Sequence, residues 1–385
     1  MTEEQLHNPA RPLRSGYTTG ACAAAAAKGA ALMLVHQITV SEVTIELPAG
    51  NSATFRLSGQ NYTSESATCF VVKDAGDDPD VTNGAEVHAT VCRSHDGAPG
   101  ITIEGGKGIG RITKPGLAVP PGQWAINPVP HQMITTAVGK IISATDKALV
   151  SISIPDGEER AKKTLNARLG IIGGLSILGT TGIVRPISAK AWTDTLDAAL
   201  DVAKACGCPT VVLSTGRTSE MAAQDFFRKQ KIGNRGQAHL FESEPSPPPA
   251  TSALQEEAYI MMGDHIAYAV RACQLRGFNA PIIACQFAKL LKIACGHENT
   301  HAAASELDLT RLLEWARHAN IPQSILESIS NANTAREIAI ACSFDPALVE
   351  LVFHHARLAV EKHAPAISPQ FLVADYSGNC IFNSR

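Results

Sequence analysis

Closely spaced carboxylates are the part of this sequence best suited to chemistry. Four of them fall within seven positions, at Asp74, Asp77, Asp78 and Asp80. Gly76 and Pro79 exclude a regular helix here, so the stretch is a loop behind the apolar run that ends at Val72. Like charges this close raise one another's pKa unless a bound cation, the neighbouring Lys73 or backbone N–H groups offset them.

Two interpretations of this acidic loop are open. Asp, Asn, Gly and Pro all favour turns, so a solvated turn accounts for the composition. The position directly behind a strand-like run, with Lys73 at its start, favours a functional loop instead. On that interpretation Asp74, Asp77 and Asp78 are candidate catalytic residues and Lys73 is a candidate substrate contact. Asp78 precedes a proline and also suits a purely structural turn.

An alanine-rich helix is expected from Ala21 to Val35, because alanine has the highest helix propensity. Thr18 or Thr19 can cap its start, where free N–H groups can also receive an anion. An ordinary N-cap explains the same threonines. Lys28 lies two turns into the helix and either reaches a carboxylate or extends into solvent. All three residues are candidate substrate contacts.

Short runs of β-strand character follow, and they predict a largely antiparallel sheet from 42–47, 53–57, 67–72, 84–92 and 100–104. A glycine-rich turn, Gly105 to Gly110, comes after the last run. Such a turn lets the backbone approach a phosphate or carboxylate, and Lys107 and Arg111 add charge, so both are candidate substrate contacts. The turn lacks P-loop spacing, and a plain turn or bulge explains it equally well.

From about Lys190 strands and helices alternate, which predicts a parallel α/β sheet. Ligands bind beyond the carboxyl ends of such strands, so three loops are candidate binding segments: 214–217, 262–264 and 286–289. Asp264 suits ribose hydroxyl groups, or it caps the helix that begins near His265. Lys289 and Lys292 share a helix face, which either binds substrate or is simply solvated.

A metal site was considered at His297, Glu298 and His301, because histidines four positions apart share one helix face. Gly296 interrupts a helix there, and no third strong ligand is near in the sequence. We therefore expect no protein-bound metal.

Composition restricts the function classes. A net charge of −3 over 385 residues argues against nucleic-acid binding. Ten scattered cysteines form no paired zinc motif and indicate a reduced, cytoplasmic enzyme. The polar start of the chain has no apolar signal core, and the alanine-rich run is too short and too interrupted for a membrane span. The proline-rich run 243–249 is expected to be a surface loop.

Five motifs occur in order within residues 14–305: Gly16–Gly20, Lys73–Thr82, Gly105–Gly110, Ala125–Pro130 and Leu175–Ile183. Together they resemble the CbiD family, the cobalt-precorrin-5B C1-methyltransferases of anaerobic cobalamin biosynthesis. Each motif alone is weak, whereas the ordered set is specific. The resemblance implies methyl transfer from S-adenosylmethionine to C1 of a cobalt-bearing corrinoid, a small-molecule substrate with many carboxylates.

With S-adenosylmethionine as the cofactor, the candidate cofactor contacts are Thr180, Thr181, Gly182, Thr215, Gly216 and Asp264. The resemblance adds His301, in a Thr300-His301 motif, to the candidate substrate contacts. The expected fold is an α+β domain with a largely antiparallel sheet over residues 1–188. A Rossmann-like α/β domain with a parallel sheet and C-terminal helices follows over residues 189–385.

One departure from the family pattern affects the cofactor contacts. A glycine-rich turn precedes the lysine pair in the family, whereas Gln286-Phe287-Ala288 stands here. The second half also has no G-x-G-x-x-G fingerprint. An alternative function is a small-molecule kinase or ATP-dependent ligase that uses the Gly105–Gly110 turn and a magnesium ion on the Asp cluster. A third alternative is a non-catalytic corrinoid carrier. The sequence is also compatible with a homo-oligomer.

Overall fold

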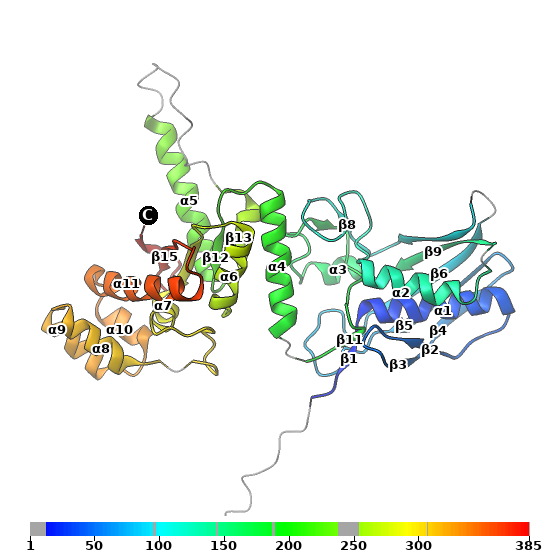
Figure 1. Ribbon diagram of the computed structural model, residues 1–385, viewed down its shortest axis with the longest axis horizontal. Coiled ribbons are helices and arrows are strands. Elements are labelled where there is room, and N and C mark those ends of the chain that lie inside the picture. Colours follow the sequence, from blue (N-terminus) through cyan, green and yellow to red (C-terminus); the bar gives the residue numbers. More distant parts are fainter. Residues whose placement is uncertain are drawn as a thin grey trace, which may run out of the picture. The chain divides into compact units, whose positions relative to one another are not determined.

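The computed structural model describes residues 13–94, 98–143, 145–186, 189–237, 254–305 and 307–384, with the side chains of 231–237 excepted (Figure 1). The proline-rich run 243–249 lies outside these residues. The chain divides into two compact units, Met1–Ala189 and Lys190–Arg385, here called unit 1 and unit 2. The expected boundary followed residue 188.

Unit 1 is built on a five-stranded sheet in the order β4-β5-β6-β9-β7. Its strands are Ser58–Tyr62, Ser66–Val72, Glu86–Ser94, Lys147–Ser153 and Gly100–Gly105 in that order. All neighbours are antiparallel except β7 and β9, which are parallel. The expectation of a largely antiparallel sheet is therefore confirmed, with one parallel pair that the sequence pattern did not reveal. A separate hairpin joins β2 (Glu42–Glu46) to β3 (Ser52–Arg56).

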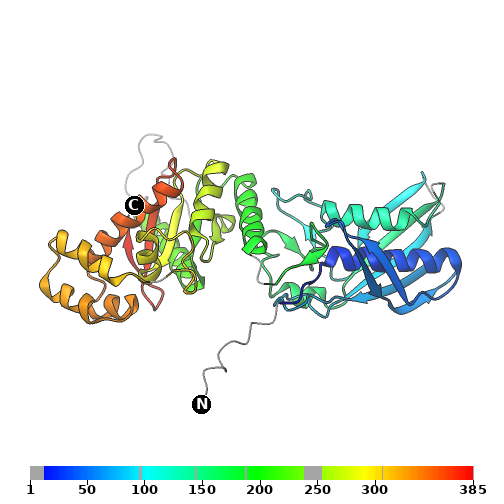
Figure 2. The same ribbon diagram turned by 60° about the horizontal axis from the view of Figure 1, so that its bottom comes forward.

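The alanine-rich helix α1, Thr19–His36, is the centre of the unit 1 core. It contacts β5 and β6 and lies beside α2, Pro128–Gly139 (Figure 2). Alanine side chains let the helix approach the sheet closely. A Cβ atom at Gly29 would lie only 2.3 Å from Leu57 Cδ1. In the described part of the chain, α1 alone is long and apolar enough to cross a membrane, but 78% of that window is buried inside the unit, as in a core helix.

Two very short strand pairs connect segments that are distant in the sequence. Strand β1 (Gly16–Tyr17) pairs with β11 (Ile183–Val184), and β8 (Arg111–Ile112) pairs with β10 (Ile171–Ile172). A short helix, α3 (Gly157–Ala161), follows β9. The first pair joins the Gly16–Gly20 motif to the end of the Leu175–Ile183 motif, and the second joins the segment after Gly105–Gly110 to the segment before Leu175–Ile183.

Unit 2 has a five-stranded sheet in the order β13-β12-β14-β15-β16. The strands in that order are Tyr259–Met261, Val212–Ser214, Ile282–Gln286, Gln370–Ala374 and Cys380–Asn383. The first four are parallel, which confirms the expected parallel sheet, and β16 returns antiparallel to β15.

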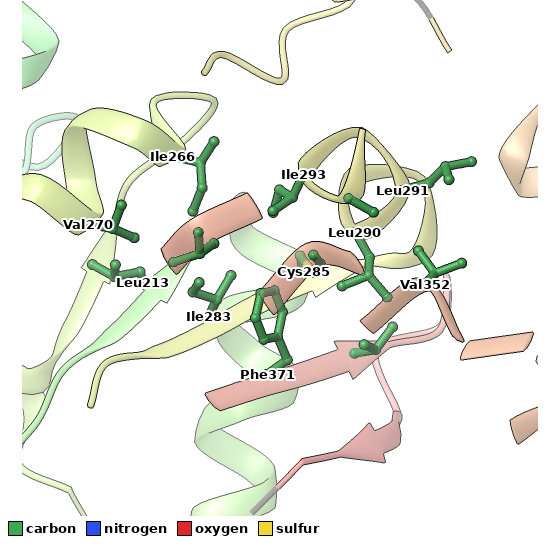
Figure 3. Close-up of a cluster of buried hydrophobic side chains, with 14 of the residues drawn as sticks. Leu213, Ile266, Val270, Ile283, Cys285, Leu290, Leu291, Ile293, Val352 and Phe371 are labelled. Atoms are coloured by element: carbon green, nitrogen blue, oxygen red, sulfur yellow. The ribbon is translucent and has the colours of Figure 1, made fainter. Parts of the chain in front are cut away.

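Helices cover both faces of this sheet, because alternate strand residues point to opposite sides. Val212, Ile282 and Leu372 pack in one cluster with the helix α5, Arg217–Gln237. Leu213, Ile283 and Phe371 pack on the other face, against α6, α7 and α11 (Figure 3). The remaining helices of unit 2 are α4 (Ala189–Ala205), η2 (Glu256–Ala258), α6 (Ile266–Arg276), α7 (Phe287–Ala294), α8 (Leu309–His318), α9 (Gln323–Asn331), α10 (Ala335–Ala341) and α11 (Pro346–His363).

The acidic loop is the connection of the β5–β6 hairpin, and a buried ion pair holds it closed. The Lys73 side chain is 1% exposed, and its Nζ lies 2.7 Å from Asp80 Oδ2. The other oxygen, Asp80 Oδ1, accepts bonds from the Thr82 amide and hydroxyl. Burial raises the pKa of Asp80, but the bond and charge of Lys73 outweigh it and hold that pKa below its ordinary value.

Asp80→Asn is expected to lower the free energy of unfolding at neutral pH by about 3 kcal/mol, because Lys73 remains as a buried cation without its partner. Since the folded-state pKa of Asp80 is lowered, the carboxylate stabilises the fold fully above the unfolded-state pKa of about 4. That contribution is lost as the pH falls through the lowered folded-state value. Thermal unfolding at about pH 7 and about pH 3 should show the variant approaching wild type in acid.

The matched control is Glu159→Gln, which removes an exposed ion pair with Lys162 in the same unit. Its expected cost is below about 1 kcal/mol. Equal losses for the two variants would contradict a stabilising role specific to the buried pair.

Candidate functional site

Arg14 binds two of the four clustered carboxylates. Its guanidinium forms a bidentate ion pair with the Asp74 carboxylate, with nitrogen–oxygen distances of 2.5 Å and 2.9 Å. The Arg14 amide donates to Asp77 Oδ2 at 2.6 Å, and the Asp77 amide donates to the Arg14 carbonyl at 2.9 Å. The hydrogen bond from Arg14 is the main reason that the pKa of Asp74 lies below its ordinary value. Arg14, Lys73 and backbone N–H groups together offset the repulsion among the carboxylates. The sequence pointed to Lys73 and to backbone N–H groups, but not to Arg14.

Two glycines allow the Arg14 segment to cross the acidic loop at backbone contact. Ser15 forms a β-bridge with Gly76, which has a φ of +69°. A Cβ atom at Gly76 would lie 2.1 Å from the Arg14 carbonyl oxygen, and one at Gly16 would lie 2.1 Å from the carbonyl carbon of Ala75. The Tyr17 amide then donates to the Asp74 carbonyl at 2.7 Å. The glycines of both motifs are therefore required by the chain crossing itself.

The threonines at the start of α1 contact the second threonine motif. The Thr18 hydroxyl accepts from the Ala21 amide, so Thr18 is the N-cap. The Thr18 amide donates to the Gly182 carbonyl at 3.1 Å, and the Thr19 hydroxyl accepts from the Leu178 amide at 3.0 Å. The Thr181 carbonyl accepts from the Ala49 amide, and the Thr181 hydroxyl accepts from the Ile183 amide. The side chain of Thr180 is exposed.

In the glycine-rich turn, most of the contacts are made between backbone groups. The amides of Gly106, Ile109 and Gly110 donate to backbone carbonyls, at 2.7, 3.2 and 2.9 Å. Gly108 has a φ of +75°, and a Cβ atom there would lie 1.9 Å from the Ile154 carbonyl oxygen. Three of the turn's amides are thus unavailable to a phosphate, and the plain-turn interpretation describes the geometry.

The remaining candidates of unit 1 occupy separate places. Lys28 donates to the Thr44 carbonyl at 2.7 Å. The Arg111 guanidinium stacks 3.8 Å from the centre of the Trp124 ring and donates to the Gly122 carbonyl. Lys107 is exposed, and Asp78 is half-buried. Among the described residues, no group of three or more His, Cys, Asp or Glu side chains is arranged to hold a metal ion.

In unit 2 the three candidate loops meet at the carboxyl ends of β12, β13 and β14. Ser214 is in register with Met261 on one side and Ala284 on the other. The Ser214 carbonyl accepts from the amides of Met262 and Gly263, and the Thr215 amide donates to the Ala284 carbonyl. Thr215 and Gly216 therefore lie at the start of α5, beside the loops that follow β13 and β14.

Asp264 is at the centre of a polar network in this region. Its Oδ1 atom accepts from the Lys289 ammonium and, at 2.7 Å, from the Thr300 hydroxyl. The Thr300 carbonyl accepts from Lys289 at 2.9 Å and from Lys292 at 3.2 Å. Burial raises the pKa of Asp264, and the bonds from Lys289 and Thr300 outweigh it, so this pKa lies below its ordinary value.

Two sequence alternatives are wrong here. Asp264 does not cap α6, because the N-cap residue is His265 and no side chain makes the capping bond. Lys289 and Lys292 are not a freely solvated face, since both bond the Thr300 carbonyl. The sequence did not indicate that Thr300 connects Asp264 to Lys289 and Lys292. Two of its three hydrogen bonds to these side chains are made by its carbonyl, for which side-chain type gives no signal.

His301 lies next to Thr300 and is exposed. Its amide donates to Asn299 Oδ1 at 2.8 Å, and its ring Nδ1 accepts from the Ala303 amide at 3.2 Å. This bond places the proton of the neutral ring on Nε2. When the ring is protonated, its positive charge also helps to lower the pKa of Asp264. The structure thus brings together Thr215, Gly216, Asp264, Lys289, Lys292 and His301 in unit 2, whereas Thr180, Thr181 and Gly182 belong to unit 1.

Comparisons with known proteins agree with the motifs. The CbiD family model matches residues 6–186, and the model of the CbiD C-terminal domain matches residues 299–385. A relative from Pelobacter propionicus is 61% identical over 388 residues, covering 97% of this chain and 96% of that protein. One from Geobacter sulfurreducens is 55% identical over 379 residues, covering 97% and 99%. Both are named cobalt-precorrin-5B C(1)-methyltransferase.

A crystal structure of the cobalamin biosynthesis protein CbiD from Archaeoglobus fulgidus is 30% identical, covers 80% of this chain and 84% of that one, and superimposes with a TM-score of 0.38. The full-length relatives and the two family models confirm the resemblance that the motifs indicated: this chain belongs to the CbiD family.

Proposed function

We propose that this chain transfers a methyl group from S-adenosylmethionine to C1 of cobalt-precorrin-5B. The observation that carries the proposal is the 61% identity, over 97% of this chain, to a relative named for that reaction. Such coverage includes both units and all the candidate loops.

We place the methyl donor at the carboxyl edge of the unit 2 sheet, on a Rossmann-like interpretation of that unit. Strand order reverses at β12, because β13 lies on one side and β14 on the other. Loops at such a reversal leave a crevice in which open α/β sheets bind nucleotides. Thr215 and Gly216 lie at this point, at the start of α5. Asp264 is close by, through the bonds of its loop to Ser214.

The donor atoms at this edge fit an adenosyl group with an amino-acid tail. All the hydrogen bonds of the Asp264 carboxylate in the described structure fall on Oδ1, so Oδ2 is available to a ribose hydroxyl. The lysine pair and the amides at the start of α5 suit a carboxylate. When bound, S-adenosylmethionine supplies a methyl group that its sulfonium already activates. The residues need only align the acceptor carbon with that methyl and exclude water.

The corrinoid carries several carboxylates, which basic side chains grip by charge-assisted hydrogen bonds. Lys107 and Arg111 are the exposed cations of unit 1 among our candidates. Thr18, Thr19, Lys28 and Lys73 have internal partners, and we assign them a supporting role in shaping this region. Asp74, Asp77 and Asp78 remain proposed catalytic residues, with His301 as a proposed substrate contact.

The alternative kinase or ligase has less support. It requires a phosphate cradle at Gly105–Gly110, where three amides already donate to carbonyls. It also requires magnesium on the Asp cluster, where Arg14 and Lys73 already form ion pairs with Asp74 and Asp80 and the Arg14 amide bonds Asp77. A non-catalytic carrier would bind corrinoid without turnover. We place the reaction in the cytoplasm, which the ten scattered cysteines without a paired zinc motif support.

The first functional prediction concerns donor binding. Isothermal calorimetry should show S-adenosylhomocysteine binding to the purified chain in buffer without added metal, because the proposed contacts are hydroxyls, amides and charged side chains. Magnesium–ATP serves as the competing ligand. Binding of magnesium–ATP without binding of S-adenosylhomocysteine would favour the kinase alternative.

The second concerns the acidic loop. At least one of Asp74→Asn, Asp77→Asn and Asp78→Asn should lower turnover tenfold or more, about 1.4 kcal/mol in the barrier, with thermal unfolding little changed. The ion pair of Asp74 with Arg14 is about half exposed, so its loss should cost less than about 1 kcal/mol of stability. The assay is methyl transfer from labelled S-adenosylmethionine to the corrinoid.

Arg14→Met is the matched control for Asp74→Asn, since it breaks the same ion pair and keeps the carboxylate. Equal turnover losses in the two variants, and no further loss in the double variant, would assign Asp74 to anchoring Arg14. Full activity in all three Asn variants would remove the loop from the catalytic site.

A further inference from the structure

Thr300 is fully buried, and each of its polar atoms forms a hydrogen bond with Asp264 or with a lysine ammonium group. Its hydroxyl donates to Asp264 Oδ1 and its amide donates to the Asp264 carbonyl, at 2.7 and 2.9 Å. Its carbonyl accepts from both Lys289 and Lys292. One residue therefore fixes a carboxylate and two ammonium groups relative to one another.

The packing of α7 explains why both lysines reach the same carbonyl. Leu290, Leu291 and Ile293 point into the unit 2 core (Figure 3). Lys289 and Lys292 lie on the remaining face, one turn apart, where their side chains are neighbours. The segment after α7 returns along this face and presents the Thr300 carbonyl between them.

The two lysines differ in how their charge is balanced. Lys289 forms an ion pair with Asp264. Within the described residues, Lys292 makes no ion pair, and its ammonium bonds only the Thr300 carbonyl. Burial, and then the nearby charge of Lys289, lower the pKa of Lys292. An anion beside Lys292 would relieve both effects, whereas an anion at Lys289 would compete with Asp264.

We propose that Lys292 is the cation that binds a ligand carboxylate at the carboxyl edge of the unit 2 sheet. Thr300 is the positioning residue that orients the Lys292 side chain, and Asp264 and Lys289 form the internal ion pair. The inference rests on the proposed function, because the carboxylate belongs either to the amino-acid tail of the methyl donor or to an acetate or propionate arm of the corrinoid. Both sources present the same chemistry to Lys292.

The experiment compares five single variants of the full chain. Lys292→Met and Lys289→Met remove one charge each and keep an apolar stem. Thr300→Val removes the hydroxyl and keeps the side-chain shape, while Thr300→Ser keeps the hydroxyl. Lys190→Met is the control, because Lys190 is an exposed lysine of unit 2 whose partner is Asp194. The readouts are calorimetric affinity for S-adenosylhomocysteine, KM for the corrinoid, kcat, and thermal unfolding.

Lys292→Met should weaken binding of one of the two ligands by roughly tenfold to a hundredfold, as for loss of a charge-assisted bond, with unchanged thermal unfolding. Weaker binding of S-adenosylhomocysteine identifies the donor tail, and a raised corrinoid KM identifies the substrate arm. The effect should diminish as salt increases. Lys289→Met should instead lower the unfolding temperature, because Asp264 loses its cation.

Thr300→Val should weaken binding of the same ligand by roughly twofold to tenfold, less than loss of the Lys292 charge itself because Thr300 acts on the ligand only through Lys292, with a smaller effect on kcat. Thr300→Ser should restore it. A Thr300→Val variant that loses only stability, with wild-type affinities, would overturn the positioning role. If that variant does not fold, Lys292→Met still decides the assignment of the cation.

Failure of the inference and failure of the proposed function are separable. If wild type is active and Lys292→Met binds both ligands like Lys190→Met, the inference alone is overturned. If wild type neither binds S-adenosylhomocysteine nor transfers methyl groups, the proposed function is overturned and this inference with it.

Discussion

Backbone segments of unit 1 cross at distances that only glycine permits. The Arg14 segment lies against Gly76, and the Gly108 turn lies against the end of β9 so closely that a Cβ atom would overlap a carbonyl. These crossings bring the start of the chain, the acidic loop and the glycine-rich turn into one framework around α1. Because the amides at the crossings are used between segments, the motif glycines primarily support the architecture. The chemistry must come from the side chains that the framework displays.

Buried or half-buried Lys–Asp pairs recur at the key loops of both units. In unit 1 Lys73 and Asp80 close the β5–β6 hairpin, with the lysine almost fully buried. In unit 2 the Lys289–Asp264 pair joins the loop after β13 to the helix after β14, the two strands on either side of β12, and both side chains are about a quarter exposed. A buried pair is a weak source of net stability but is costly to break, so it fixes one loop conformation against alternatives. The pair of unit 2 is the more exposed of the two to solvent.

The sequence predicted the parts of the fold that follow local periodicity. The antiparallel strands of unit 1 and the strand–helix alternation of unit 2 have repeating patterns of apolar residues, and the alanine-rich helix follows from the helix propensity of alanine. The parallel pairing of β7 with β9 was missed, because strand order depends on contacts that periodicity does not encode. In unit 2, the rule that ligands bind beyond the carboxyl ends of parallel strands correctly predicted that Thr215, Asp264 and Lys289 lie in one region. Arg14 and Thr300 were missed, because one reaches across 60 positions to Asp74 and the other acts partly through its carbonyl.

The pairing of β1 with β11 sets Gly16 opposite Val184, so the chain enters and leaves the folded part of unit 1 at the same place. A domain whose ends are neighbours can be inserted into another polypeptide, or circularly permuted, without opening its core. Unit 1 therefore has the topology of a transferable module. A change of connection at this one point would leave the helix α1 and its sheet intact.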